Sequence, residues 1–98
     1  MKLPIRYQRA AINEYLDAAN WLDDQRPGFG AAFIQAVDAT IDRIRTDPRR
    51  YPIEYEDIRL APVPEYSYVI YYRIENDRIR VLSVFHTSRD PAVWQARL

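Results

Sequence analysis

The side chains best suited to chemistry lie in the last third of the chain, around a single histidine. His86 ends an apolar segment, and Arg89 and Trp94 follow it closely. An imidazole at the end of a strand can act as a general acid or base, or as a hydrogen-bonding anchor. A lone histidine also serves as a structural residue bonded to a backbone carbonyl. The sequence leaves both interpretations of His86 open.

Arginine supplies all but one of the 14 basic residues. A guanidinium group holds a carboxylate or a phosphate in a planar fork, so Arg59, Arg73, Arg80 and Arg89 are candidates to line one concave binding surface. Three of them, Arg59, Arg73 and Arg89, are also candidate catalytic residues together with His86. Ordinary solvent-exposed ion pairs with nearby acidic residues are the alternative.

Two aromatic residues complete the candidate site. Tyr71 lies on the more polar face of a predicted strand, where it can contact a partner. Trp94 follows Asp90-Pro91, and these two residues suit the N-cap and first position of a short helix. Such a turn would fold Trp94 onto the sheet, so we expect it to act largely through the fold.

Composition excludes several classes of function. The chain has 98 residues, a net charge of zero and no cysteine, which predicts one domain over residues 1–98 without disulfides. One histidine and two glycines argue against a histidine metal cluster or a glycine-rich nucleotide loop, so we expect no metal and no cofactor. We also expect no membrane segment, a cytoplasmic location and no sequence-specific DNA binding by this chain.

Hydrophobic spacing predicts a strand near residues 3–8 and a helical hairpin over about residues 9–46. In the second helix, Phe29, Phe33, Val37 and Ile41 recur at steps of four, and Asp47-Pro48 ends it. The first helix should end near residue 25. Its predicted apolar side consists of Ile12, Tyr15, Leu16, Ala19 and Leu22.

The second half predicts a small, mostly antiparallel sheet of three or four strands. Residues 48–56 read as a surface loop, and the strand at 58–60 is expected at an edge because Pro62 and Pro64 follow it. Residues 66–73 and 78–85 should form a hairpin over Asn76-Asp77, a candidate type I′ turn. Strict alternation from that turn predicts one face packed on the helices, with Tyr66, Tyr68, Ile70, Tyr72, Ile74, Ile79, Val81 and Phe85. It predicts a mixed, half-open face with Val69, Tyr71, Arg73, Arg80, Leu82, Val84 and His86.

Taken in order, these elements resemble the ParE/RelE family of toxins from bacterial type II toxin–antitoxin systems. The resemblance covers nearly the whole chain and rests on Ala11, Tyr15, Phe33, Ile41 to Pro48, Arg59, Tyr66-Ser67-Tyr68, Ile70, Tyr72, and the ending His86, Arg89, Pro91 and Trp94. Ser67 stands where the family carries a proline. The resemblance implies an α/β (α+β) fold with a helical hairpin on a small sheet and a short C-terminal helical turn. It also implies a plasmid-stabilisation type of toxin neutralised by a cognate antitoxin.

Two activities are known in that family. ParE-type members poison DNA gyrase, whereas RelE-type members cut mRNA on the ribosome. Ribosomal cleavage needs several proton-transfer groups and a basic surface, and this chain has one histidine and no net charge. We therefore expect a gyrase inhibitor without catalysis of its own, with Arg59, Arg73, Tyr71, Arg89 and Trp94 as target-binding residues. The alternatives are a RelE-type endoribonuclease and an inactive member that acts only as a binding module.

Overall fold

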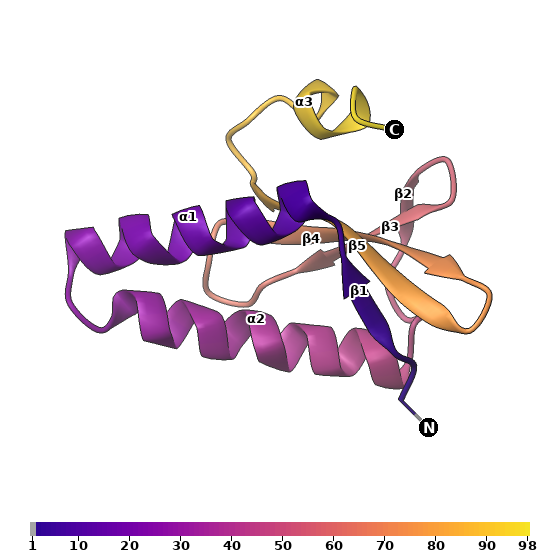
Figure 1. The fold of residues 1–98 in the computed structure, drawn as a ribbon, viewed down its shortest axis with the longest axis horizontal. Coiled ribbons are helices and arrows are strands. Elements are labelled where there is room, and N and C mark those ends of the chain that lie inside the picture. The colour runs from indigo at the N-terminus through magenta and orange to yellow at the C-terminus, as the bar shows by residue number, and fades with distance from the viewer. Residues whose placement is uncertain (1) are drawn as a thin grey trace.

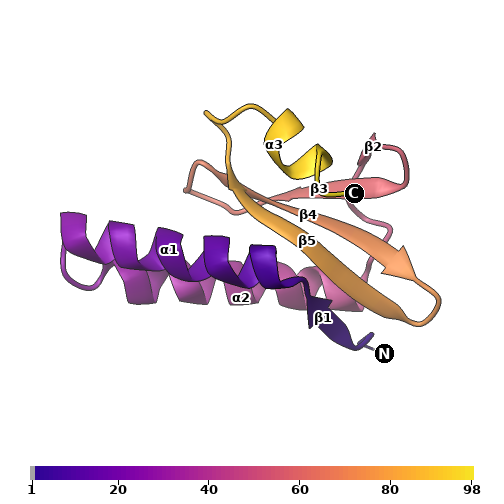
Figure 2. The same cartoon turned by 45° about the horizontal axis from the view of Figure 1, so that its top comes forward.

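The computed structural model describes residues 2–98, which form a helical hairpin packed on one face of a five-stranded sheet (Figure 1). A short third helix lies on the opposite face (Figure 2). The elements in chain order are β1 (Ile5–Tyr7), α1 (Arg9–Gln25), α2 (Phe29–Thr46), β2 (Ile53–Tyr55), β3 (Ile58–Pro62), β4 (Tyr68–Glu75), β5 (Arg78–His86) and α3 (Ala92–Gln95). The predicted α+β fold and helical hairpin are confirmed.

The connection between α1 and α2 depends on Asp23 and two glycines. Gly28 precedes α2 with φ 95°, a left-handed conformation that glycine adopts without a steric penalty. The Asp23 carboxylate accepts hydrogen bonds from the backbone N–H groups of Gly28 (3.0 Å) and Gly30 (3.3 Å), so an acidic side chain of α1 caps α2. A Cβ at Gly30 would lie 2.6 Å from the carbonyl oxygen of Ala19, so this glycine lets the helices approach closely.

The buried sides of the helices agree with the prediction in α2 and differ from it in α1. Phe33, Val37 and Ile41 are buried in α2, but Phe29 is 41% exposed. In α1 the buried residues are small, namely Ala11, Ala18 and Ala19. Ile12 and Leu16, predicted on the buried side, are largely exposed. The close approach of α1 to its neighbours selects alanines for the contact and turns these longer side chains outward.

The sheet has the strand order β1-β5-β4-β3-β2, with β1 parallel to β5 and the other pairs antiparallel. It has five strands where three or four were expected, because β2 forms within the predicted loop. The prediction that β3 lies at an edge is therefore wrong for its first half. Ile58 and Arg59 pair with β2. Pro62 lies beyond that pairing, so its lack of a backbone N–H removes no hydrogen bond to β2.

The hairpin of β4 and β5 keeps the predicted register near its turn. Glu75 lies opposite Arg78. Asn76 has φ 49°, and it is the one residue of the two-residue turn with a positive φ. A type I′ turn requires a positive φ at both central residues, so the predicted turn type is wrong.

An irregularity at Leu82 changes the register beyond the turn. Tyr72 lies opposite Val81 as predicted, but Tyr71 lies opposite Ser83, so β5 carries one extra residue. A β-bulge of this kind moves every following side chain to the other face. His86 therefore lies opposite Tyr68 on the helix side of the sheet. For this reason the predicted faces of Val84, Phe85 and His86 are wrong: Val84 and His86 lie on the helix side of the sheet, and Phe85 lies on the other side.

The opposite face of the sheet is covered by the C-terminal segment. Trp94 is fully buried there and stacks on Tyr71, with ring centroids 4.2 Å apart. Asp90 caps the short helix as predicted, since its carboxylate accepts the backbone N–H of Ala92 at 2.9 Å. The residues buried on this face are Ile58, Val69, Tyr71, Leu82, Phe85 and Trp94. The face predicted to be half open is thus a second small core.

Candidate functional site

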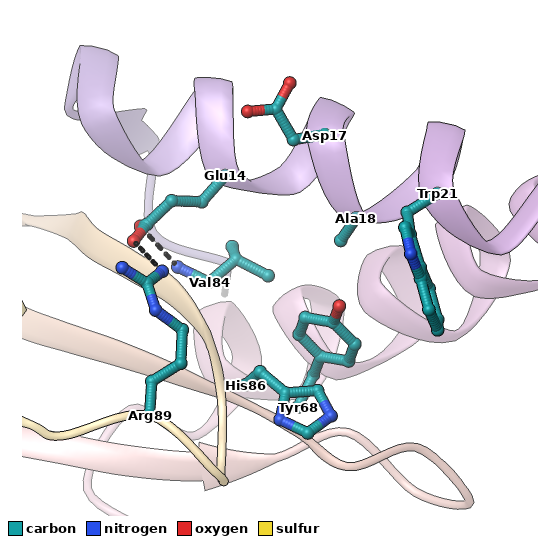
Figure 3. A pocket seen from close by; sticks show the side chains of 8 residues that line it. All are labelled: Glu14, Asp17, Ala18, Trp21, Tyr68, Val84, His86 and Arg89. Atoms are coloured by element: carbon teal, nitrogen blue, oxygen red, sulfur yellow. Dashed lines mark hydrogen bonds and ion pairs between the residues drawn. The ribbon is translucent and has the colours of Figure 1, made fainter.

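A surface cleft with a volume of about 210 Å³ lies between α1 and the end of β5 (Figure 3). Its walls combine acidic, basic and aromatic side chains. One wall is helical and the other comes from the sheet and the turn after it. The lining residues are Glu14, Asp17, Ala18, Trp21, Tyr68, Val84, His86 and Arg89. We call this site the α1–β5 cleft.

The cleft exists because β1 is short. β1 pairs with β5 only at residues 79–81, so the following part of β5 faces α1 in place of another strand. Glu14 occupies this edge, where its Oε1 accepts hydrogen bonds from the Ser83 hydroxyl (2.7 Å) and the Val84 backbone N–H (3.3 Å). Arg97 donates to the carbonyl oxygen of Leu82 at 3.4 Å. These side chains satisfy backbone groups that an open strand edge would leave unpaired.

His86 is held in one orientation at the base of the cleft. Its Nδ1 accepts a hydrogen bond from the backbone N–H of Ser88 at 3.0 Å, and the Ser88 Oγ lies 2.7 Å from the same nitrogen. The imidazole packs edge-on against Tyr68, with ring centroids 4.9 Å apart. An Nδ1 that accepts this bond places the proton of the neutral ring on Nε2. The arrangement suits a hydrogen-bonding anchor better than a general base.

Arg89 is the cationic group of the cleft. Its guanidinium lies 4.8 Å from the centre of the Phe85 ring, and its Nη1 lies 3.8 Å from Oε2 of Glu14. About half of the side chain remains exposed (49%). Burial raises the pKa of the Tyr68 phenol, and the nearby Arg89 guanidinium partly offsets this increase.

Trp21 is one of the cleft residues that the sequence prediction missed, together with Glu14 and Asp17. Its side chain is 57% exposed although tryptophan is among the largest apolar residues. It lies one turn beyond Asp17 on α1, and Figure 3 shows both residues on the helical wall. A tryptophan on the polar side of an amphipathic helix was a signal available in the sequence.

The structure does not bring the predicted arginines together. Arg59 donates to the carbonyl oxygens of Tyr51 (2.6 Å) and Arg49 (3.3 Å), and so fixes the loop after α2. Arg59 is paired with Tyr72 and His86 with Tyr68, which separates them by about 13 Å along the strands and about 10 Å across them. The predicted shared surface of Arg59 and His86 is therefore wrong.

Arg73 and Arg80 are engaged near the hairpin turn, on the opposite face of the sheet. Arg73 forms a two-pronged ion pair with Asp57, with nitrogen–oxygen distances of 3.0 Å. Hydrogen bonding to Arg73 lowers the pKa of Asp57. Arg80 bonds Glu75 at 2.8 Å. Of the four predicted arginines, Arg89 alone lines the cleft with His86.

Two other predicted target-binding residues are not on the surface. Tyr71 is 5% exposed, and Trp94 covers it. The prediction that Tyr71 is free to contact a partner is wrong, because the bulge and α3 turn its surroundings into a core. The burial of Trp94 agrees with its expected role in the fold.

Tyr72 shows how a polar group is accommodated in the main core. Its side chain is fully buried, and its hydroxyl donates a 2.6 Å hydrogen bond to the carbonyl oxygen of Pro48. Burial raises the pKa of Tyr72 to about 12. This bond fixes the end of α2 to the centre of the sheet.

Residues 2–98 contain no cluster of three or more histidine and acidic side chains arranged to hold a metal ion. In the same part of the chain, no helix combines the length and apolar character needed to cross a membrane.

The fold is similar to that of a solved structure described as the chromosomal ParDE TA system from P. aeruginosa. That structure matches with a TM-score of 0.76 at 11% identity, covering 87% of this chain and 96% of that one. At this identity the likeness concerns the fold.

The sequence itself places the chain in a family. The family described as the ParE toxin of type II toxin-antitoxin system, parDE, matches residues 5–91. The chain therefore belongs to the ParE toxin family. A search of curated proteins finds no match.

Proposed function

We propose that this chain is a growth-inhibiting toxin that acts in the cytoplasm on DNA gyrase, without catalysis of its own, and is neutralised by a cognate antitoxin. Membership of the ParE family supports the toxin class. The observation that carries the choice of a non-catalytic mechanism is the separation of the candidate catalytic groups. Arg59 and Arg73 are both bonded elsewhere and lie far from His86.

A ribonuclease of the RelE type would need converging groups. One group must activate the 2′-hydroxyl, another must stabilise the phosphorane, and a third must protonate the leaving oxygen. In the α1–β5 cleft, Arg89 lies 3.8 Å from the Glu14 carboxylate and Asp17 is also a lining residue, so acidic groups offset the positive charge that a phosphate would require. These features favour a protein target over RNA.

We propose that the target is contacted through the α1–β5 cleft, with Trp21 and Arg89 as the main contacts. Exposed tryptophan and arginine side chains are the residue types that contribute most to protein–protein binding. Arg73, which is partly exposed at the other end of the sheet, is a second contact in this proposal. Arg73→Ala should weaken toxicity without unfolding the domain, because an exposed ion pair contributes about 1 kcal/mol or less to stability.

We propose a separate surface for the antitoxin on the outer side of the helical hairpin. Ile12 and Leu16 lie one turn apart on α1 and are 41% and 52% exposed. Ile34 of α2 is also exposed, and its carbonyl oxygen accepts a 3.2 Å hydrogen bond from Tyr15, which lies between these two α1 residues in sequence. An exposed apolar stripe of this kind fits the apolar side of an amphipathic helix.

The antitoxin part of the proposal is tested by co-purification with the product of the adjacent gene. Leu16→Asp should weaken that association while the melting temperature stays close to that of the wild type. If no neighbouring product binds the chain, the antitoxin proposal fails.

The target is tested by inducing the chain in cells and measuring DNA breaks and mRNA ends in the same cultures. Gyrase inhibition predicts DNA damage and intact mRNA. Cuts in mRNA at ribosomal A sites with normal supercoiling would transfer the chain to the RelE-type activity. A chain that binds an antitoxin but causes neither effect would be a binding module.

A further inference from the structure

Glu14 contacts several residues that lie far from it in the sequence. It is an α1 residue, 14% exposed, that contacts the bulged part of β5 and two C-terminal arginines. Its Oε1 accepts from Ser83 and Val84 and lies 3.5 Å from Nη2 of Arg97. Its Oε2 faces Nη1 of Arg89 at 3.8 Å.

The two carboxylate oxygens therefore have different roles. Oε1 replaces a missing strand partner for β5, which is a structural role. Oε2 faces a half-exposed arginine at the mouth of the α1–β5 cleft (Figure 3). The aromatic ring of Phe85 lies 4.8 Å from the same guanidinium. A guanidinium held between a fixed carboxylate and an aromatic ring has lost much of its conformational freedom before a partner binds.

The contacts with Arg89 and Arg97 also bracket α3. α3 (Ala92–Gln95) lies between these arginines in sequence and has only four residues. A helix of that length has little stability of its own, so its position depends on tertiary contacts. Trp94 supplies the apolar contact, and Glu14 supplies the charged contact on each side of it.

We propose that Glu14 is a positioning residue for toxicity, which holds Arg89 in the α1–β5 cleft and fixes residues 87–98 against α1. Glu14 acts through Arg89 and contacts no target itself. This inference rests on the proposed toxic function and on the cleft as the target-contact surface, but not on whether the target is gyrase or the ribosome.

Glu14→Gln separates the two roles. The amide oxygen of glutamine can still accept from Ser83 and Val84, whereas the charge that attracts Arg89 and Arg97 is lost. Ser83→Ala is the matched structural variant, since it removes the shortest bond on the Oε1 side and leaves the carboxylate in place. Asp24→Asn, an exposed α1 residue outside the cleft, controls for the loss of one negative charge.

Three measurements are made on each full-length variant: growth inhibition at known cellular level, melting temperature, and backbone hydrogen exchange of residues 87–98. For Glu14→Gln, the level needed to halve the growth rate should rise about tenfold or more, the scale of losing a principal arginine contact. Exchange of residues 87–98 should become faster. Ser83→Ala should lower the melting temperature at least as much but retain toxicity, and Asp24→Asn should behave as wild type.

A double variant tests whether Glu14 acts through Arg89. Arg89→Gln should reduce toxicity to a similar degree, and Glu14→Gln combined with Arg89→Gln should be no weaker than either alone. Full toxicity in Glu14→Gln would overturn the inference. Toxicity that simply follows melting temperature in the Glu14 and Ser83 variants would also overturn it. If the wild-type chain does not slow growth, the proposed function fails, and unchanged exchange in Glu14→Gln would separately exclude the positioning role.

Discussion

Replacing Phe33 by alanine tests the packing of the main core where it joins both helices to the sheet. Phe33 is fully buried in α2. Its ring contacts Tyr15 of α1 (6.1 Å between centroids), Tyr66 (5.2 Å) and Tyr68 (5.0 Å), so it joins both helices to β4 and the segment before it. Removal of a buried phenylalanine costs about 3–5 kcal/mol, because apolar burial is lost and a cavity remains.

That cost is a large part of the roughly 5–15 kcal/mol that stabilises a domain of this kind. Phe33→Ala should therefore lower the melting temperature by about 12 °C or more, at 4–8 °C per kcal/mol for a domain of about this size. Urea unfolding followed by circular dichroism measures the free energy of unfolding directly. The denaturant slope should stay unchanged, which shows that the variant alters stability and not the extent of unfolding.

Phe29→Ala is the matched control on the same helix. Phe29 is 41% exposed, with the Arg26 guanidinium 5.1 Å from its ring centre, and its replacement should cost less than about 1 kcal/mol. A cost below about 0.5 kcal/mol for Phe33→Ala would refute the assignment of this residue to the core. Equal costs at the two positions would refute the predicted difference in burial.

Three further predictions concern the helix contact, the pH dependence and the histidine. Gly30→Ala should destabilise the domain by about 1–3 kcal/mol in urea unfolding, because its Cβ would press on Ala19; an unchanged midpoint would show that the helices separate without cost. Tyr72 has its pKa raised from 10.0 to about 12 in the folded chain, so its contribution to stability is complete below pH 10 and is lost as the pH rises to about 12. Tyr72→Phe should lose less stability than wild type between those pH values, and parallel curves would contradict this origin. His86→Gln should keep its fold and most of its toxicity, because glutamine can still bond Ser88; a folded variant that binds antitoxin but lacks toxicity would favour a catalytic histidine.

The helical hairpin could be predicted because its signals are local. The spacing of Phe33, Val37 and Ile41 indicated one buried side, and Pro48 indicated the end of α2. The exposure of Leu16 could not be read in the same way. It depends on how closely α1 approaches the sheet and α2, and that distance is set by alanines and by Gly30.

The candidate site could be predicted only in part because a single residue reverses the faces of β5. Strict alternation placed His86 on the side of Tyr71, and the extra residue at Leu82 placed it opposite Tyr68 instead. Nothing in the local sequence marks this bulge, whose neighbouring groups are bonded by Glu14, far away in the chain. Arg89 was predicted correctly as a residue beside His86, since only two residues separate them.

We propose that this member of the ParE family inhibits DNA gyrase directly. The most direct measurement is supercoiling of relaxed plasmid by purified gyrase, with the purified chain added alone, with its antitoxin, or as the Arg89→Gln variant. We expect loss of supercoiling with the wild-type chain, restoration by the antitoxin, and a weaker effect of the variant. Normal supercoiling at every concentration of a folded chain that still arrests growth would contradict this proposal.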